Sequence, residues 1–593
     1  MASIIQGAGR SVLCWDEQKL VIQLSRQVLG KLWTALIERL TELWQAGSFF
    51  VWTQPAMTAR GSGPDAPRWK SFPLDVWSGL MFMLKVSPKH ELVRLWQVID
   101  WTQINALAAQ AYTNAHGGRY AWAPAQMIAL LVLMFLYGVP HETTLLDRVK
   151  ENIVWCWFCG LSLFGPWPDH STIYTFRERM KRQDLFEQVL TLAVQACIEA
   201  GLVSNELVHF DLTEVIANGH RWSPYERAVV LSKALIRYLE LVWADQAPQK
   251  PFPATLRTLA VEVALESLPH KTLEQVAPEQ VVASMARWDA QAGPAQTDWQ
   301  LTLEEAAQAQ LSTTEAPFLK TFRLEQCKAC LALAAKAILK RLPHTRGDQD
   351  ARVGRTSNYS WFCGYLLGFV VDGWRHIITA VAWGAGNIDQ PLLFRPAMEQ
   401  HCQRVGKPKG VALDSAFDDP AVYAYLDAHS IAGHITSRQH TKPRDGGFGP
   451  DRVIWHPTQS WLCPQGAPLR IQGRKDRDRG RYIFGGTACG SCALYVQCYP
   501  KGEGQAKSFT FNPERHRRWL QNREHCRTEA YKVAQRARFV EEGRFGLAKM
   551  VHRAGRAPYR SEAMNRVAGL MIAAVMDWRL LARHRSPVLA KSA

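Results

Sequence analysis

The sequence lacks a hydrophobic run long enough to cross a lipid bilayer. Its strongest run, Met127–Val139, has 13 residues, whereas a membrane-spanning helix needs about 20, so we expect a buried helix there. Residues 1–15 also lack the uninterrupted apolar core and small-residue site of a secretory signal. No segment of 20–50 residues repeats, which argues against a solenoid. These absences favour a cytoplasmic protein with no membrane partner.

Acidic residues are scarce relative to basic ones. The 53 Asp and Glu residues face 70 Lys and Arg residues, which gives a net charge of +17 and favours a polyanionic partner such as nucleic acid. The excess is uneven, because residues 241–320 carry a net charge of −5 and residues 431–530 a net charge of +9. The apolar fraction of 47% predicts a folded chain, and 593 residues exceed a single core. We therefore expect several domains, with phosphate contacts concentrated in residues 431–530.

The hydrophobic periodicity predicts helices at both ends of the chain and a mixed sheet between them. Residues 88–200 and 222–345 have helical spacing, and residues 440–527 have no clear period. The remaining segments are strands at 206–211, 364–372 and 376–383, a helix at 389–405, a strand at 410–414, a helix at 418–430, a strand near 434–437, and helices from 528 to 585. This order predicts an α/β fold with helices on the faces of the sheet. It matches an RNase H-like nuclease core that is interrupted twice.

Three carboxylates stand out within this pattern. Asp211 and Asp414 each end a predicted strand, and a carboxylate at that place can face a shared cleft, although it can also cap the following turn. Glu542 lies on a predicted helix with Arg538 and Lys549 on the same face. Such a face suits a metal site flanked by phosphate-binding cations, or an exposed ladder of ion pairs. Glu541 is the competing carboxylate, about 100° around the helix.

Four of the 13 cysteines fall in the basic segment. Cys463, Cys489, Cys492 and Cys498 have the spacing C-x25-C-x2-C-x5-C, whose middle pair is typical of a metal knuckle. We expect them to bind a structural Zn²⁺, which would supply order to a segment with little apolar material. An iron–sulfur cluster is the main alternative, and unligated buried thiols are the third.

Basic side chains surround these cysteines. One strip, residues 470–481, contains Arg474 and Lys475, and a second run contains Arg515, Arg517 and Arg518. Guanidinium groups bind phosphates through forked hydrogen bonds, so we expect DNA contacts from these residues, with a solvated charged surface as the alternative.

Short motifs along most of the chain carry a resemblance to a known family. At the catalytic positions they are Asp211-Leu212-Thr213, Asp350-Ala351-Arg352, Asp414-Ser415-Ala416-Phe417-Asp418 and the helix with Arg538, Glu542 and Lys549. In the N-terminal region they are Ile99-Asp100-Trp101, Trp122-Ala123-Pro124, Asn152, Trp157–Leu161 and Pro168–Thr172. In this order and placement, the chain resembles bacterial insertion-sequence transposases of the DDE type.

The resemblance implies an RNase H-like catalytic core and DNA transposition by a nucleoid-associated protein. Asp211, Asp414 and Glu542 would hold two Mg²⁺ ions, which Mn²⁺ can replace, and the protein would act on double-stranded DNA as a homodimer. Together with the periodicity it gives an extension at 1–86, a DNA-binding domain at 87–200, a core at 201–221 and 346–439, a helical insertion at 222–345, a cysteine-bearing insertion at 440–527, and C-terminal helices at 528–593.

Two positions depart from the family pattern, and two rival functions remain open. Gln535 stands where the family often has Tyr, and Ser415-Ala416-Phe417 replaces its usual Lys-Gly-Tyr. A decayed or domesticated transposase would bind DNA without cutting it, and a magnesium-dependent nuclease would cut without joining. A cut-and-join assay separates the three.

Overall fold

The computed structural model divides by its internal contacts into two compact units, residues 1–200 with 574–593 and residues 201–573. The structure describes residues 76–585 and a few residues between 30 and 38. Within 76–585 it leaves out residues 113–120, 247–250, 269–272, 274–275, 291–323, 342–344, 356–359, 439–445, 459, 477–479 and 502–504. Most of the expected extension at residues 1–86 lies outside the described residues.

The first unit is helical where it is described. Its helices are α3 (Val76–Lys85), α4 (Glu91–Val98), α5 (Trp101–Ala109), α6 (Pro124–Leu136), α7 (Glu142–Glu151), α8 (Ile153–Phe158), α9 (His170–Arg182) and α10 (Leu185–Glu199). Every residue of α6 is buried, which confirms the buried helix expected from the long apolar run. No helix among the described residues has both the length and the apolar character that crossing a membrane requires.

Polar motif residues of this unit close the ends of its helices. Asp100, Asn152 and Asp169 are the N-caps of α5, α8 and α9, and each side chain accepts hydrogen bonds from backbone amides of the first turn. Such caps satisfy donors that the helix itself leaves unpaired. These residues therefore specify where helices begin, which is a structural task.

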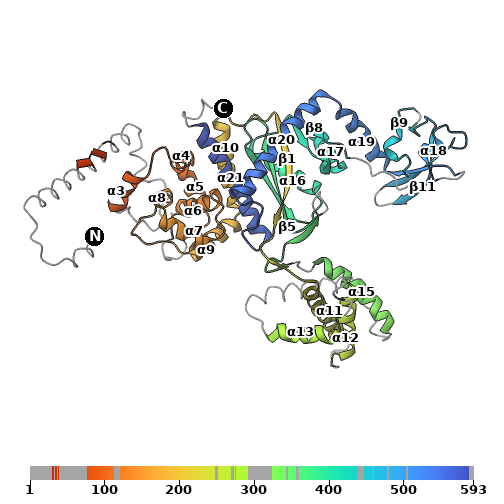
Figure 1. The fold of residues 1–593 in the computed structure, drawn as a ribbon, viewed down its shortest axis with the longest axis horizontal. Coiled ribbons are helices and arrows are strands. Elements are labelled where there is room, and N and C mark those ends of the chain that lie inside the picture. The colour runs from red at the N-terminus through yellow and green to blue at the C-terminus, as the bar shows by residue number, and fades with distance from the viewer. Residues whose placement is uncertain are drawn as a thin grey trace, which may run out of the picture. The chain divides into compact units, whose positions relative to one another are not determined.

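The second unit is built on a six-stranded mixed sheet (Figure 1). Its strands are β1 (Leu207–Ile216), β4 (Arg352–Arg355), β5 (Trp361–Asp372), β6 (Ile378–Ala385), β7 (Gly410–Leu413) and β8 (Ala432–Ile435). The hydrogen-bonded order is β4-β5-β1-β7-β8, with β6 also paired to β5. β1 is antiparallel to β5 and parallel to β7, and β7 is parallel to β8. This mixed α/β sheet agrees with the RNase H-like fold class expected from the sequence.

Helices cover both faces of this sheet. On one face, α16 (Pro391–Arg404) and α17 (Pro420–Ala428) bury a core that includes Phe210, Val370 and Phe394. On the other face, Phe545 of α20 (Glu529–Met550) stacks on Phe369 of β5, with ring centroids 4.9 Å apart. Alternate residues of a strand point to opposite faces, so His209, Asp211 and Thr213 of β1 face away from Phe210 and toward the α20 side.

Two insertions interrupt this core. After β1 and the short β2 (His220–Arg221) come α11 (Pro224–Gln246), α12 (Ala254–Glu266), α13 (Pro278–Ala290) and α15 (Leu324–Arg341), before β3 (Thr345–Arg346) pairs with β2. Helices α11, α12 and α15 share one hydrophobic core, and α13 packs against α11 and α12 in a second, smaller one. The second insertion contains η6 (Pro450–Arg452), β9 (Ile454–His456), β10 (Ser460–Leu462), β11 (Leu469–Asp476), β12 (Arg481–Gly486), α18 (Tyr495–Cys498), β13 (Ser508–Phe511) and α19 (Pro513–His525).

Two sequence-based expectations are corrected by this arrangement. The strand expected at 206–211 continues to Ile216, because Thr213 and Val215 keep the buried alternation while β5 pairs along the whole length. Asp211 is therefore in the middle of its strand. The cysteine-bearing segment is not without apolar material, because Trp461, Phe484 and Phe511 form a small core between its strands.

Candidate active site

Asp211 and Asp414 come from neighbouring parallel strands. The register of β1 and β7 pairs Leu207 with Gly410 and His209 with Ala412, residues 203 apart. Asp414 also follows Asp211 by 203 residues and directly follows β7, so continuing the register brings the two carboxylates level.

Asp414 also organises the turn after its strand. It is the N-cap of the short helix η5 (Ser415–Phe417), and its Oδ1 accepts a hydrogen bond of 2.9 Å from the amide of Ala416. Turn capping was the structural alternative for this residue, and the structure shows that Asp414 performs it. The carboxylate is half-buried, so capping by one oxygen is compatible with a second role.

Glu542 reaches the same part of the fold from α20. This helix packs against β1, β7 and β8, and its own residues Phe545 and Ala548 are buried. Glu542 itself is exposed, and its charge acts on Asp211. The side chain of Glu541, the competing carboxylate, lies outside the described part of the chain.

Gln535 joins α20 to the ends of two strands. Its side-chain amide donates hydrogen bonds to the carbonyl of Leu413, at 3.1 Å, and to that of His434, at 2.7 Å. Leu413 is the residue before Asp414. The sequence marked Gln535 only as a departure from the usual Tyr, and no sequence pattern showed that it spans β7 and β8.

Arg538 links this anchor to Asp211. Its Nε donates to Oε1 of Gln535 at 3.2 Å, and its Nη1 donates to Oδ2 of Asp211 at 3.0 Å. Both charged side chains are mostly buried, with exposed fractions of 17% and 23%. In this arrangement the cation of Arg538 therefore balances the charge of Asp211.

The balance is incomplete. Burial, and then the charges of Asp414 and Glu542, raise the pKa of Asp211 from 3.8 to about 6, although the Leu212 amide and Arg538 act in the opposite direction. An ionised carboxylate is disfavoured where it is desolvated and near like charges. The three carboxylates therefore create a concentration of negative charge that a bound cation would relieve.

Lys549, the second cation expected beside Glu542, forms an ion pair with Glu214. The Nζ–Oε2 distance is 3.7 Å, and the side chains are 39% and 37% exposed. Glu214 lies on β1, three residues after Asp211. Both cations of this helix face thus pair with carboxylates of β1, whereas an ion-pair ladder would pair them with Glu542 of the same helix.

The donor chemistry of Asp211, Asp414 and Glu542 suits a hard cation such as Mg²⁺, which prefers oxygen ligands. Among the described residues, however, no group of three or more His, Cys, Asp or Glu side chains is arranged to hold a metal ion. Both oxygens of Asp211 have protein partners, because Oδ1 accepts a hydrogen bond from the Leu212 amide and Oδ2 pairs with Arg538.

The four cysteines of the second insertion line one small cavity of about 50 Å³. Burial raises the pKa of the Cys498 thiol to about 11, and the other three cysteines add to the rise while Lys507 opposes it. The fold therefore brings these four cysteines to one cavity although they are separated in the sequence. Among the described residues, however, their thiols are not arranged as a metal-binding group. The side-chain positions thus give the expected zinc no support.

The basic residues expected to contact DNA have different surroundings. Arg518 forms an ion pair with Asp427, Arg517 lies over the ring of Trp455, and Arg474 lies over that of Tyr482. Lys475 is exposed on β11. Arg515 lines a cleft beside α19.

Comparison with known families yields two matches. A family described as a transposase domain (DUF772) matches residues 81–179, and a family described as a transposase DDE domain matches residues 462–582. The second match includes the four cysteines and Glu542, and neither match includes Asp211 or Asp414. No curated protein and no solved structure matches the chain.

Proposed function

We propose that this protein cuts transposon ends and joins the freed 3′ ends to target DNA, because the two matched domains indicate an insertion-sequence transposase of the DDE type. The observation that carries this proposal is that Asp414 directly follows the strand that pairs with β1, and that the charges of Asp414 and Glu542 both act on Asp211. The family implies the use of a divalent metal, usually Mg²⁺.

Asp211, Asp414 and Glu542 are the residues that would hold the metal. Two Mg²⁺ ions, or Mn²⁺ in their place, would activate the attacking oxygen and stabilise the leaving oxygen. In the first reaction water attacks a phosphodiester at the transposon end, and the P–O3′ bond breaks to leave a 3′-hydroxyl. In the second, that hydroxyl attacks a target phosphodiester, and the displaced target 3′-oxygen leaves.

Arg538 and Lys549 have a complementary task in this proposal. Each pairs with a carboxylate of β1 in the structure. Arg538 can exchange Asp211 for a DNA phosphate when a metal neutralises that carboxylate, and Lys549, whose pair with Glu214 is partly exposed, can turn to a neighbouring phosphate. Arginine is suited to this exchange because its fork of donors binds two oxygens at once. Gln535 holds the Nε side of Arg538, which leaves Nη1 as the group that changes partner.

The cysteine cavity has a separate role in the proposal. Cys463, Cys489, Cys492 and Cys498 are four soft ligands on one cavity, a donor set that suits zinc or an iron–sulfur cluster. We propose that they bind a structural Zn²⁺. DNA binding as a homodimer belongs to the same proposal, because two ends must be joined together.

The experiment is a cut-and-join assay with duplexes that carry the inverted repeats flanking the reading frame. With Mg²⁺, the full-length chain should cleave these duplexes and transfer their 3′ ends to a second DNA. Asp414→Asn and Glu542→Gln should bind the ends but yield neither product. Cleavage without joining would identify a nuclease, and binding without cleavage a decayed or domesticated transposase.

A further inference from the structure

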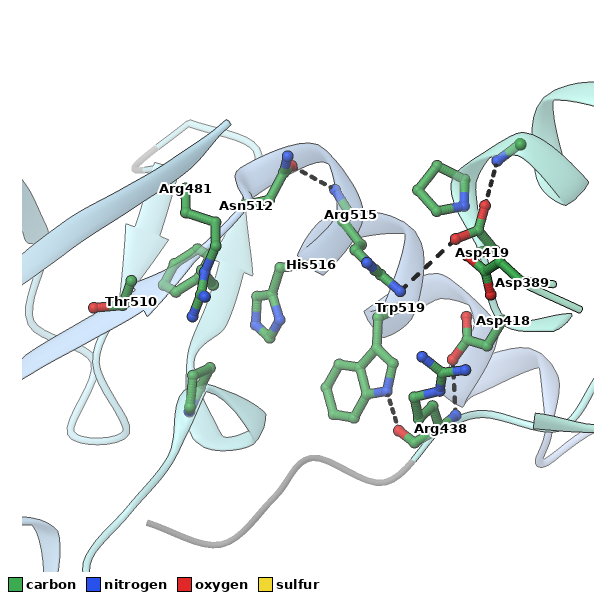
Figure 2. A pocket seen from close by; sticks show the side chains of 14 residues that line it. Asp389, Asp418, Asp419, Arg438, Arg481, Thr510, Asn512, Arg515, His516 and Trp519 are labelled. Atoms are coloured by element: carbon green, nitrogen blue, oxygen red, sulfur yellow. Dashed lines mark hydrogen bonds and ion pairs between the residues drawn. The ribbon is translucent and has the colours of Figure 1, made fainter. Parts of the chain in front are cut away.

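A cleft of about 830 Å³ lies beside α19, between the catalytic core and the second insertion. Asp418, Asp419 and Pro420, at the start of α17, form one wall. Figure 2 shows Arg515 of α19 reaching toward Asp419 in this wall and the indole of Trp519 reaching toward Arg438, with Arg481 of β12 on the other side of α19. All of these residues belong to the second unit.

Three guanidinium groups line this cleft. Arg481 comes from β12, Arg515 from the first turn of α19, and Arg438 from the segment after β8. The N-terminus of α19 adds the positive end of a helix dipole. Phosphate groups are the natural ligands of such a set, because guanidinium donors match phosphate oxygens in pairs.

Three carboxylates also line the cleft, so its formal charges balance, and two of these carboxylates are held by backbone amides. Oδ2 of Asp418 accepts a hydrogen bond of 2.7 Å from the amide of Arg438, and Oδ1 of Asp419 accepts one of 3.0 Å from that of Ala421. Arg515 is 4.0 Å from Asp419, a loose ion pair. Asp389 is the third carboxylate of the lining, and its charge opposes phosphate binding.

The cleft is connected to the carboxylate centre through η5. Nη2 of Arg438 donates a hydrogen bond to the carbonyl of Ala416 at 3.2 Å, and the amide of Ala416 in turn donates to Oδ1 of Asp414. The indole of Trp519 donates to the carbonyl of Arg438 at 2.8 Å. A polymer held in the cleft would therefore lie next to the segment that positions Asp414.

We propose that this cleft binds the phosphates of a single DNA strand, through Arg438, Arg481 and Arg515, as that strand continues from the phosphate at the carboxylate centre. The proposal rests on the function proposed above. The cleft volume is in the range of about 300–1,000 Å³ that is typical of small-ligand pockets, so it accommodates a short stretch of one strand rather than a duplex. Arg438 has no role in the sequence-based assignment, whereas Arg481 ends the basic strip 470–481 and Arg515 belongs to the second basic run.

The test measures binding of a fluorescein-labelled single-stranded oligonucleotide of thymidines, and of a blunt duplex, by anisotropy. The full-length protein is used in EDTA, so that no chemistry occurs. The variant R481Q/R515Q removes two cleft cations. The matched control R257Q/R395Q removes two exposed cations that lie outside both the cleft and the basic segment, and D389N removes the opposing charge.

We expect R481Q/R515Q to weaken single-strand binding about tenfold at 0.1 M salt, and to reduce the slope of log K against log salt by about 1.4, or ~0.7 for each lost phosphate. D389N should tighten binding, and the blunt duplex should respond less to both changes. Equal melting temperatures of the two double variants establish that folding is intact. The single variant R481Q removes one cleft cation and should therefore lose about half as much of the salt slope.

The proposal is overturned if R481Q/R515Q binds the single strand as the control does, or if the duplex loses as much affinity as the single strand. Weaker binding by D389N would also contradict it. A wild-type chain that fails to cut transposon ends in Mg²⁺ refutes the proposed function instead. Because the binding test contains no divalent metal, the two failures are distinguishable.

Discussion

Asp211 lies in the middle of β1, Asp414 directly follows the parallel neighbouring strand β7, and the charge of Asp414 helps to raise the pKa of Asp211 to about 6. A site that concentrates carboxylates destabilises the protein until a cation arrives. The carboxylates that the proposed function needs therefore lower the stability of the metal-free protein, and this loss of stability can be measured.

We expect Asp211→Asn to stabilise the metal-free protein at pH 8 but not at pH 4. Because the folded pKa lies above the ordinary value of 3.8, the cost of ionisation is absent at low pH and is complete above about pH 6. A shift of this size corresponds to at most ~3 kcal/mol, so we expect a gain of about 1–3 kcal/mol. Thermal melts at both pH values measure it. Asp245→Asn, at an exposed position, should change neither melt, and a lower melting temperature of Asp211→Asn at pH 8 would contradict the expectation.

Gln535→Met should slow DNA cleavage while the chain still binds DNA. Methionine has a similar length but no donors, so the carbonyls of Leu413 and His434 lose their partner and Arg538 loses its anchor. Each unsatisfied group costs roughly 1–3 kcal/mol. Cleavage rates and melting temperatures of this variant should both fall, whereas Gln521→Met, at an exposed position on α19, should leave both unchanged. Wild-type cleavage by Gln535→Met would show that the anchor has no part in catalysis.

Lys549→Gln should weaken DNA binding without destabilising the fold. Its ion pair with Glu214 is about two-fifths exposed on both sides, and such pairs contribute only ~0–1 kcal/mol. Loss of one phosphate contact should reduce the salt slope for duplex binding by about 0.9. Lys532→Gln is the matched control, because Lys532 lies on another face of α20 and its charge pairs with Glu529. Identical slopes for the two variants would mean that Lys549 serves the fold alone.

Purified protein should contain about one zinc ion per chain, held by the four cysteines of the second insertion. Cys489→Ser should lose this metal and lower the melting temperature of the insertion, because a structural site adds binding energy to folding. Cys330→Ser, in α15, should retain it. Metal analysis decides the question. Near-stoichiometric iron with a brown colour would replace zinc by an iron–sulfur cluster, and the absence of both metals would leave four unligated thiols.

The sequence by itself determined the order of the core elements. Strand and helix periods reflect which side chains are buried, and burial follows directly from local hydrophobic patterning. The positions of β5, β6, α16, β7 and α17 therefore agree closely with those expected. The motif residues were also visible, since Asp414 directly follows a short apolar strand.

Only the tertiary structure decided how the motif residues meet. The length of β1 depended on its pairing with β5. Asp211 was predicted at the end of this strand and lies in its middle. The partners of Arg538 and Lys549 depended on how α20 packs across β1, and no local pattern encodes a contact between residues 327 positions apart. Gln535 illustrates the same limit, because its substitution was visible in the sequence but its two carbonyl partners come from separate strands. Hydrogen-bond partners are set by three-dimensional proximity, whereas burial patterns are set along the chain, and that difference separates what could be predicted from what could not.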